Sequence, residues 1–254
     1  MRYGGGPVNA LKEYLKELHL PTIRRCYEEE AEHARRDSLS HEEYLQSLIE
    51  QEVEERRQNR VTRFLRQSKL PLEKTLDTFV RSRLSPVENQ KVDALLDGGF
   101  IGRSENVLAF GGPGGGKTHL LCAIGIELIH KGYRVRFYSC SLLVQELLIA
   151  KRDMKLARFL KSLSKFDALI IDDIGYVQQS REEMEVLFTL LAERYERGSV
   201  MLTSNLQFSQ WERIFKDPMT TAAAIDRLVH HSVILELNEP SFRLEESKKA
   251  KKGA

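Results

Sequence analysis

One stretch of the sequence leaves few folds open. Residues Gly111–Thr118 read Gly-Gly-Pro-Gly-Gly-Gly-Lys-Thr and match the pattern GxxxxGK[ST] in full. An apolar run, Asn106–Phe110, precedes this stretch and predicts a strand, and a helical pattern begins near Lys117. Glycines let the backbone wrap closely around a phosphate, and the start of a helix adds the positive end of its dipole. The order strand, loop, helix therefore predicts a phosphate-binding loop; an ordinary glycine-rich turn is the weaker interpretation.

Each polar residue of this loop has an expected role. Lys117 is expected to reach the β- and γ-phosphates, and the Thr118 hydroxyl to bind Mg²⁺. A guanine-specificity motif of the Asn-Lys-x-Asp kind is absent from the sequence, so ATP is the expected nucleotide. The predicted nucleotide-binding residues are Gly111, Gly112, Pro113, Gly114, Gly115, Gly116, Lys117, Thr118 and His119.

Two adjacent carboxylates end a second apolar run, Ala168–Ile171. Asp172 suits a magnesium ligand, and Asp173 suits the polarisation of an attacking water. Two acids at the end of a strand also cap turns, but beside a phosphate-binding loop that interpretation is weaker. The pair predicts hydrolysis of the nucleotide rather than binding alone.

A third strand is predicted over Ser199–Ser204 and is followed by Asn205. Ligands of parallel sheets bind at the carboxyl ends of strands, so Asn205 is expected beside the same phosphates. There it would position the water or sense the γ-phosphate. A plain turn asparagine is the alternative.

Short apolar runs alternate with helical patterns through the second part of the chain, which predicts an α/β fold with a parallel sheet covered on both faces. A strand lies in sequence between the phosphate-loop strand and the acidic strand, as in P-loop proteins with an additional strand. The five predicted strands are Asn106–Phe110, Tyr133–Cys140, Asp167–Asp173, Ser199–Ser204 and Ser232–Leu237. The predicted helices are Lys117–His130, Ser141–Lys165, Arg181–Arg197 and Gln207–Val229.

The first part of the chain has helical periodicity throughout. Pro21 is expected to open a helix, and Ser40 with Glu43 forms a capping-box pattern. We expect a helical domain over 1–70 that binds DNA or a partner and a linker over 71–100. An ATPase domain over 101–244 and a basic disordered tail over 245–254 complete the expected division.

The 254 residues carry a net charge of only +2, but two stretches are locally basic. One lies between Arg56 and Arg83, the other between Lys151 and Lys165. Each is either a solvated helix face or a surface for the phosphate backbone of DNA; the stretches lack interleaved aromatic residues, so base reading is not expected. The predicted DNA-binding residues are Arg56, Arg57, Arg60, Arg63, Lys151, Arg152 and Lys155.

Three widely spaced cysteines exclude a disulfide framework and a cysteine-rich zinc site. The amino terminus lacks the apolar core of a secretory signal, and the sequence has no stretch long enough to span a membrane. A cytoplasmic protein without a membrane partner is therefore expected.

Several of these motifs together resemble the IstB family of transposase helper ATPases, which are AAA+ proteins related to the DnaC helicase loader. The resemblance runs from about residue 10 to 244. Its motifs are Gly111–His119, Asp172–Tyr176, Glu193–Ser199, Ser204–Trp211, Ala223–His231 and Leu15–Pro21.

The resemblance implies a protein that binds ATP, assembles on duplex DNA as a ring or spiral, deforms the target and recruits a cognate transposase. It implies that Arg227 acts as the arginine that completes the ATP site of a neighbouring subunit. Many AAA+ proteins carry Glu where this chain has Asp173, and the short sequence after Leu237 suggests that the usual helical lid is missing.

Two other functions stay open at this point. A DnaC-like helicase loader would share the same motor motifs, so only the amino-terminal helices and the partner distinguish it. A small-molecule P-loop kinase is the weaker alternative, because lid arginines and an acceptor pocket are not recognisable in the sequence.

Overall fold

A computed structural model describes residues 7–175, 180–215, 218–238 and 241 of the chain. The chain divides into two compact units, Met1–Arg63 and Phe64–Ala254. The division lies within a helix, a few residues before the expected end of the helical domain.

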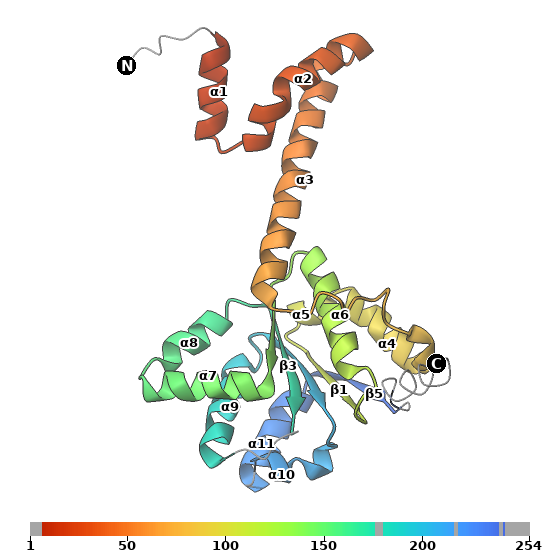
Figure 1. Ribbon diagram of the computed structural model, residues 1–254, viewed down its shortest axis with the longest axis vertical. Coiled ribbons are helices and arrows are strands. Elements are labelled where there is room, and N and C mark those ends of the chain that lie inside the picture. The colour runs from red at the N-terminus through yellow and green to blue at the C-terminus, as the bar shows by residue number, and fades with distance from the viewer. Residues whose placement is uncertain (1–6, 176–179, 216–217, 239–240, 242–254) are drawn as a thin grey trace, which may run out of the picture. The chain divides into compact units, whose positions relative to one another are not determined.

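The first unit is helical, as predicted. It contains α1 (Pro7–Glu17), α2 (Pro21–Asp37) and the larger part of α3 (His41–Ser68) (Figure 1). Pro21 is the first residue of α2. The predicted capping box is present: the Ser40 N–H donates to Glu43 Oε2 at 2.8 Å, and the Glu43 N–H donates to Ser40 Oγ at 3.2 Å. Leu15, Ile23, Tyr27 and Leu48 form the small core of this unit.

A buried carboxylate joins α2 to α3. Glu52 Oε2 accepts the backbone N–H groups of Thr22 at 2.8 Å and Ile23 at 3.2 Å, at the start of α2. Its Oε1 accepts from Arg56 Nε at 2.7 Å. Burial opposes the charged form, but Arg56 and the two N–H groups outweigh it, so the pKa of Glu52 is lowered.

We therefore predict that Glu52→Ala destabilises the first unit by about 2 kcal/mol, because two helix N–H groups lose their acceptor. The pKa of this carboxyl is lower in the folded state than in the unfolded state, where it is about 4.3. Its contribution to the stability of the fold is therefore complete at pH values above about 4.3 and is lost as the pH falls through the folded-state pKa. The difference between wild type and variant in urea unfolding, followed by circular dichroism, should shrink in acid. Fluorescence of Trp211, the single tryptophan and part of the second unit, is the internal control. A difference independent of pH would contradict the assignment.

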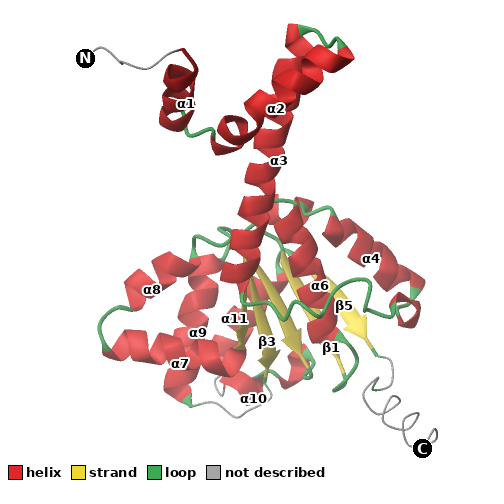
Figure 2. Cartoon of the chain, turned by 45° about the horizontal axis from the view of Figure 1, so that its top comes forward, coloured by secondary structure: helices red, strands yellow, loops and turns green. Residues whose placement is uncertain are grey.

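The second unit is built on one parallel sheet of five strands (Figure 2). The strands are β1 (Asn106–Gly111), β2 (Val135–Ser139), β3 (Ala168–Ile174), β4 (Ser199–Ser204) and β5 (Ser232–Leu237). Their order is β2-β3-β4-β1-β5, so β4 separates the strand of the phosphate loop from the acidic strand. The predicted five-stranded parallel sheet is confirmed, and all five strands lie where the apolar runs placed them.

Helices cover both faces of the sheet. On one face lies α6 (Lys117–His130) with α4 (Pro86–Leu96), and on the other lie α7 (Cys140–Arg152), α9 (Arg181–Arg194) and α11 (Pro218–Val229). Successive residues of a strand point to opposite faces, so a strand covered on both sides must be apolar at every position. In β1, Leu108 packs in the core beneath α7 and α9, and its neighbours Val107 and Ala109 are also fully buried.

Two helices predicted as continuous are interrupted. The segment 141–165 divides into α7 and α8 (Leu156–Leu163). Met154 adopts a left-handed conformation with φ 55°, and the N–H groups of Met154 and Lys155 donate to the carbonyls of Lys151 and Ala150. This is a Schellman cap, which helical periodicity alone does not reveal. Farther along, the segment 207–229 contains η2 (Phe208–Gln210), α10 (Glu212–Phe215) and α11.

The expected linker over 71–100 is wrong as a description of structure. It contains η1 (Arg81–Arg83), α4 and α5 (Gly99–Gly102). Pro86 does not break a helix but begins one, with the Ser85 hydroxyl accepting the Glu88 N–H as N-cap. Lys91 Nζ donates to the Ile234 carbonyl at 2.8 Å, and Glu88 Oε2 accepts the Glu236 N–H, so α4 is fastened to β5.

The predictions of a disordered basic tail over 245–254 and of a missing lid concern a part of the chain outside the described residues. In the described part, no helix has the length and apolar character needed to cross a membrane. The three cysteines are free thiols, as predicted, and burial raises the pKa of Cys122 to about 12.

Candidate nucleotide-binding site

The phosphate loop connects β1 to α6. Its backbone is left-handed at Gly114, with φ 76°, and at Gly116, with φ 92°, the residue that caps α6. A Cβ atom added at Gly114 would collide with Ser241 Oγ, and one at Gly116 would lie 3.0 Å from the Phe79 ring. Glycine is therefore required at both positions by conformation and by space. The loop forms a backbone cradle before a helix N-terminus, which is the geometry that binds phosphate.

Lys117 reaches back across this loop. Its ammonium donates to the Gly111 and Gly112 carbonyls, each at 2.9 Å, and the residue is only 6% exposed. The lysine thus braces the loop internally and holds a positive charge at the cradle.

The two acids are positioned by a residue that we did not single out from the sequence. The register between β3 and β4 shifts between Ile171 and Ile174, and the two acids lie in this irregular stretch. Thr203, fully buried on β4, donates from Oγ1 to Asp172 Oδ1 at 2.7 Å and accepts the Asp173 N–H at 2.8 Å. A threonine within an otherwise apolar strand was the available signal. One hydroxyl fixes both acids.

Asp173 has a left-handed backbone with φ 60° and an exposed side chain, whereas Asp172 is 8% exposed. Because β3, β4 and β1 are neighbours, their carboxyl ends bring Asp173, Asn205 and the phosphate loop together at one edge of the sheet. The sequence-based grouping of these side chains agrees with their placement.

These groups line one cavity of about 720 Å³, a volume typical of small-molecule sites. Eleven of its twenty lining residues come from segments that the sequence did not assign to the site. The lining residues are Lys74, Thr78, Phe79, Val80, Arg83, Leu84, Ser85, Glu88, Pro113, Gly114, Gly115, Gly116, Lys117, Thr118, His119, Asp173, Asn205, Glu236, Leu237 and Asn238.

His119 holds residues 74–85 against the phosphate loop. Its Nε2 lies 3.0 Å from the Thr75 carbonyl and 3.1 Å from Thr78 Oγ1. A carbonyl only accepts, so Nε2 carries a hydrogen and the Thr78 hydroxyl accepts as well. The Phe79 ring packs edge-on against the imidazole, with 5.4 Å between centroids. The segment has no motif of its own, and only folding brings it to the loop.

The cavity has the donor set for a magnesium nucleotide. The glycine cradle and Lys117 offer donors to phosphate oxygens, and the Thr118 hydroxyl and the Asp172 carboxylate are oxygen ligands of the kind that Mg²⁺ prefers. Phe79, Val80, Leu84 and Leu237 add an apolar wall.

Arg227 lies away from this cavity. The carbonyls of Arg227 and Leu228 accept from Asn106 Nδ2 at 3.4 and 3.1 Å, at the start of β1, whereas the phosphate loop follows the end of that strand. The guanidinium stacks over the Phe188 ring at 4.7 Å and donates to the Ala223 carbonyl. Six strand residues span roughly 17–20 Å, so Arg227 cannot serve the phosphates of its own chain.

The predicted DNA-binding side chains differ in their pairing. Arg56 is held by Glu52, Arg57 lies 3.9 Å from Glu54, and Lys151 pairs with Glu185 at 2.9 Å. Arg152 and Lys155 both lie near Asp153, at 3.6 and 3.9 Å. Arg57, Lys151, Arg152 and Lys155 keep more than two fifths of the side chain exposed, as does Arg56, whose partner Glu52 is buried. Arg60 and Arg63 are also exposed.

Comparison with known proteins agrees with this site. Residues 13–250 match the family model described as IstB-like ATP binding protein. A putative insertion sequence ATP-binding protein of Sinorhizobium fredii is 42% identical, over 94% of this chain and 80% of the relative. The putative ATP-binding protein of insertion sequence IS5376 from Geobacillus stearothermophilus is 38% identical, over 94% of this chain and 95% of the relative.

Solved structures show the same fold. The replication initiator DnaA bound to AMPPCP and single-stranded DNA superposes with a TM-score of 0.58 at 20% identity, covering 73% of this chain and 56% of that one. DnaI superposes with a TM-score of 0.54 at 22% identity, covering 68% and 94%. These neighbours share the fold of this chain over about 70% of its length. With the family match and the relatives above, the chain belongs to the IstB-like ATP-binding proteins, the helper proteins of IS21-type insertion sequences.

Proposed function

We propose that this protein is an ATP-dependent, DNA-binding regulator of transposition that assembles on duplex target DNA, deforms it and recruits its cognate transposase. The convergence of the phosphate loop, Asp173 and Asn205 on one cavity, with Asp172 next to Asp173 at the end of β3, carries the ATPase part of the proposal. Relatives named as insertion sequence ATP-binding proteins support the role in transposition.

In the proposed ATPase each side chain has one task. The cradle and Lys117 bind the phosphates, and Thr118 and Asp172 would hold Mg²⁺, which when bound offsets the phosphate charge. Asp173 accepts a proton from the attacking water, and Asn205 orients that water. Thr203 holds the Asp172 carboxylate and the Asp173 backbone N–H in place through its hydroxyl.

Arg227 is proposed to act on the ATP site of a neighbouring copy. Its place at the opposite edge of the sheet rules out service to its own site, which supports a role at the site of another copy. ATP hydrolysis would then depend on a homo-oligomer, a ring or spiral, whose formation requires ATP and DNA.

DNA contact is proposed through phosphates rather than bases. Arg60 and Arg63 of α3, Arg152 at the end of α7 and Lys155 just before α8 are exposed cations. Arg158, Lys161 and Lys165 extend the second group with exposed side chains for which the described part of the chain shows no ion pair. Cations on a helical surface follow a phosphate backbone without reading sequence, which leaves the deformability of the DNA as the source of target preference.

Sedimentation of the purified chain with a duplex of several helical turns tests this proposal. Large complexes are expected only when ATP, Mg²⁺ and DNA are all present, and Arg227→Ala should prevent them. If about six phosphates are contacted, affinity should fall roughly 10³-fold between 50 and 200 mM salt. A chain that ignores DNA in every nucleotide state would instead favour a DnaC-like helicase loader, to be pursued by pulldown of a helicase partner.

A further inference from the structure

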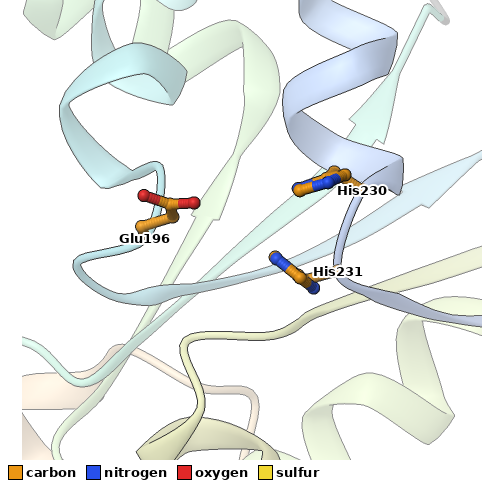
Figure 3. Close-up of side chains that lie close together, drawn as sticks. All are labelled: Glu196, His230 and His231. Atoms are coloured by element: carbon orange, nitrogen blue, oxygen red, sulfur yellow. The ribbon is translucent and has the colours of Figure 1, made fainter.

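The turns that precede β4 and β5 bring three metal-ligating side chains together. Glu196 lies in the turn between α9 and β4, and His230 and His231 lie in the turn between α11 and β5 (Figure 3). One ligand atom from each residue lies within 4.8 Å of the other two. All three side chains are exposed, and Figure 3 shows them directed toward one another.

Hydrogen bonds with buried polar residues hold both turns in place. Asn106, 8% exposed, accepts the Val200 N–H through Oδ1 at 2.9 Å and donates its backbone N–H to the His231 carbonyl at 2.7 Å. Arg194, 4% exposed, donates to the Asp167 and Ser199 carbonyls at 2.9 Å each. The backbone that carries the three ligands is therefore fixed before any ion arrives, which lowers the entropic cost of binding.

A neighbouring hydroxyl orients one of the ligands. The Tyr195 hydroxyl lies 3.2 Å from His230 Nδ1, which leaves Nε2 of that ring for an ion. Glu196 itself has φ 58°, a conformation that costs a non-glycine residue energy.

We propose that Glu196, His230 and His231 bind a divalent transition-metal ion, with Zn²⁺ the best match, at the edge of the sheet opposite the nucleotide cavity. Two imidazoles and one carboxylate are a known three-ligand set for zinc with a position left for water. Ligand atoms on tetrahedral zinc lie about 3.4 Å apart, so side-chain rotation closes the site. Hard ions such as Mg²⁺ prefer oxygen-only sites and are excluded by the imidazoles. The ion joins the end of α11, three residues beyond Arg227, to the start of β4.

Calorimetric titration with Zn²⁺ tests the site. The full chain is used, without a histidine tag and without nucleotide. Glu196→Gly removes the carboxylate and also suits the positive φ, so this variant keeps the fold; His231→Ala removes an imidazole while sparing the contact of His230 with Tyr195. We expect one ion per chain in wild type, at least tenfold weaker binding in both variants, and unchanged binding in the matched control His130→Gln, whose histidine lies at the end of α6. Zn²⁺ should also raise the melting temperature of wild type and His130→Gln only.

Absence of zinc binding by wild type would overturn the proposal. So would unchanged affinity in either Glu196→Gly or His231→Ala, because the site needs all three ligands. One ion shared by two chains would show a different, intermolecular site.

Discussion

Lys117→Ala is expected to lower the affinity for ATP by at least 100-fold, which corresponds to about 2.7 kcal/mol. The substitution removes the cation that faces the phosphates, and it also removes the two hydrogen bonds that brace the loop at the Gly111 and Gly112 carbonyls. Both losses weaken the same cradle. Binding of a fluorescent ATP analogue with Mg²⁺, followed by titration, measures the effect.

Lys131→Ala is the matched control, because Lys131 lies at the other end of α6 and its nearest acid, Asp97, is 4.0 Å away. Its affinity for ATP should equal that of wild type. Trp211 fluorescence checks that the second unit is folded in both variants. Equal affinity of wild type and Lys117→Ala would refute the assignment of the cavity.

Asp173→Asn is expected to slow ATP hydrolysis 10²- to 10³-fold while ATP affinity changes less than about threefold. Asparagine has the same shape and tolerates the left-handed backbone at this position as well as aspartate does, and the N–H bond to Thr203 Oγ1 is retained. The variant therefore removes only the proton acceptor. Phosphate release under single-turnover conditions with DNA measures the rate.

Asp173→Ala should also bind ATP and hydrolyse it slowly, but alanine at φ 60° adds strain, which makes the asparagine variant the cleaner one. Asp226→Asn, on the surface of α11, is the control and should keep the wild-type rate. Hydrolysis at the wild-type rate by Asp173→Asn would assign the proton transfer to another group.

Local patterns in the sequence predicted the sheet and the centre of the site. The glycine loop, the acids after Ile171 and Asn205 after Ser204 all follow apolar runs, and in a parallel sheet the ends of neighbouring strands converge. The central strands β1, β3 and β4 were located accurately because strands buried on both faces are nearly continuous apolar runs, whereas the edge strands β2 and β5 contain the charged residues Arg136 and Glu236.

The rest of the site depends on contacts between residues distant in sequence. Thr78 meets His119 only after its segment has packed against α6, and Glu88 meets Glu236 only after α4 has packed on β5. Periodicity carries no information on such pairs, so the segment 71–100 was interpreted as a linker. For the same reason the burial of Glu52 against Thr22 and Ile23, which fixes the carboxylate that holds Arg56, was not visible in a stretch that reads simply as basic.

Residues 74–85, in the chain segment that follows α3, form one wall of the nucleotide cavity, and the hydrogen bond between His119 and the Thr75 carbonyl holds this segment in place. Binding equilibria that share such a wall obey reciprocity. Any protein or nucleic acid that displaces this segment on binding changes the affinity for ATP, and ATP changes the affinity for that ligand by the same factor. The affinity of the cavity for ATP thus depends on the position of this segment as well as on the contacts with the nucleotide.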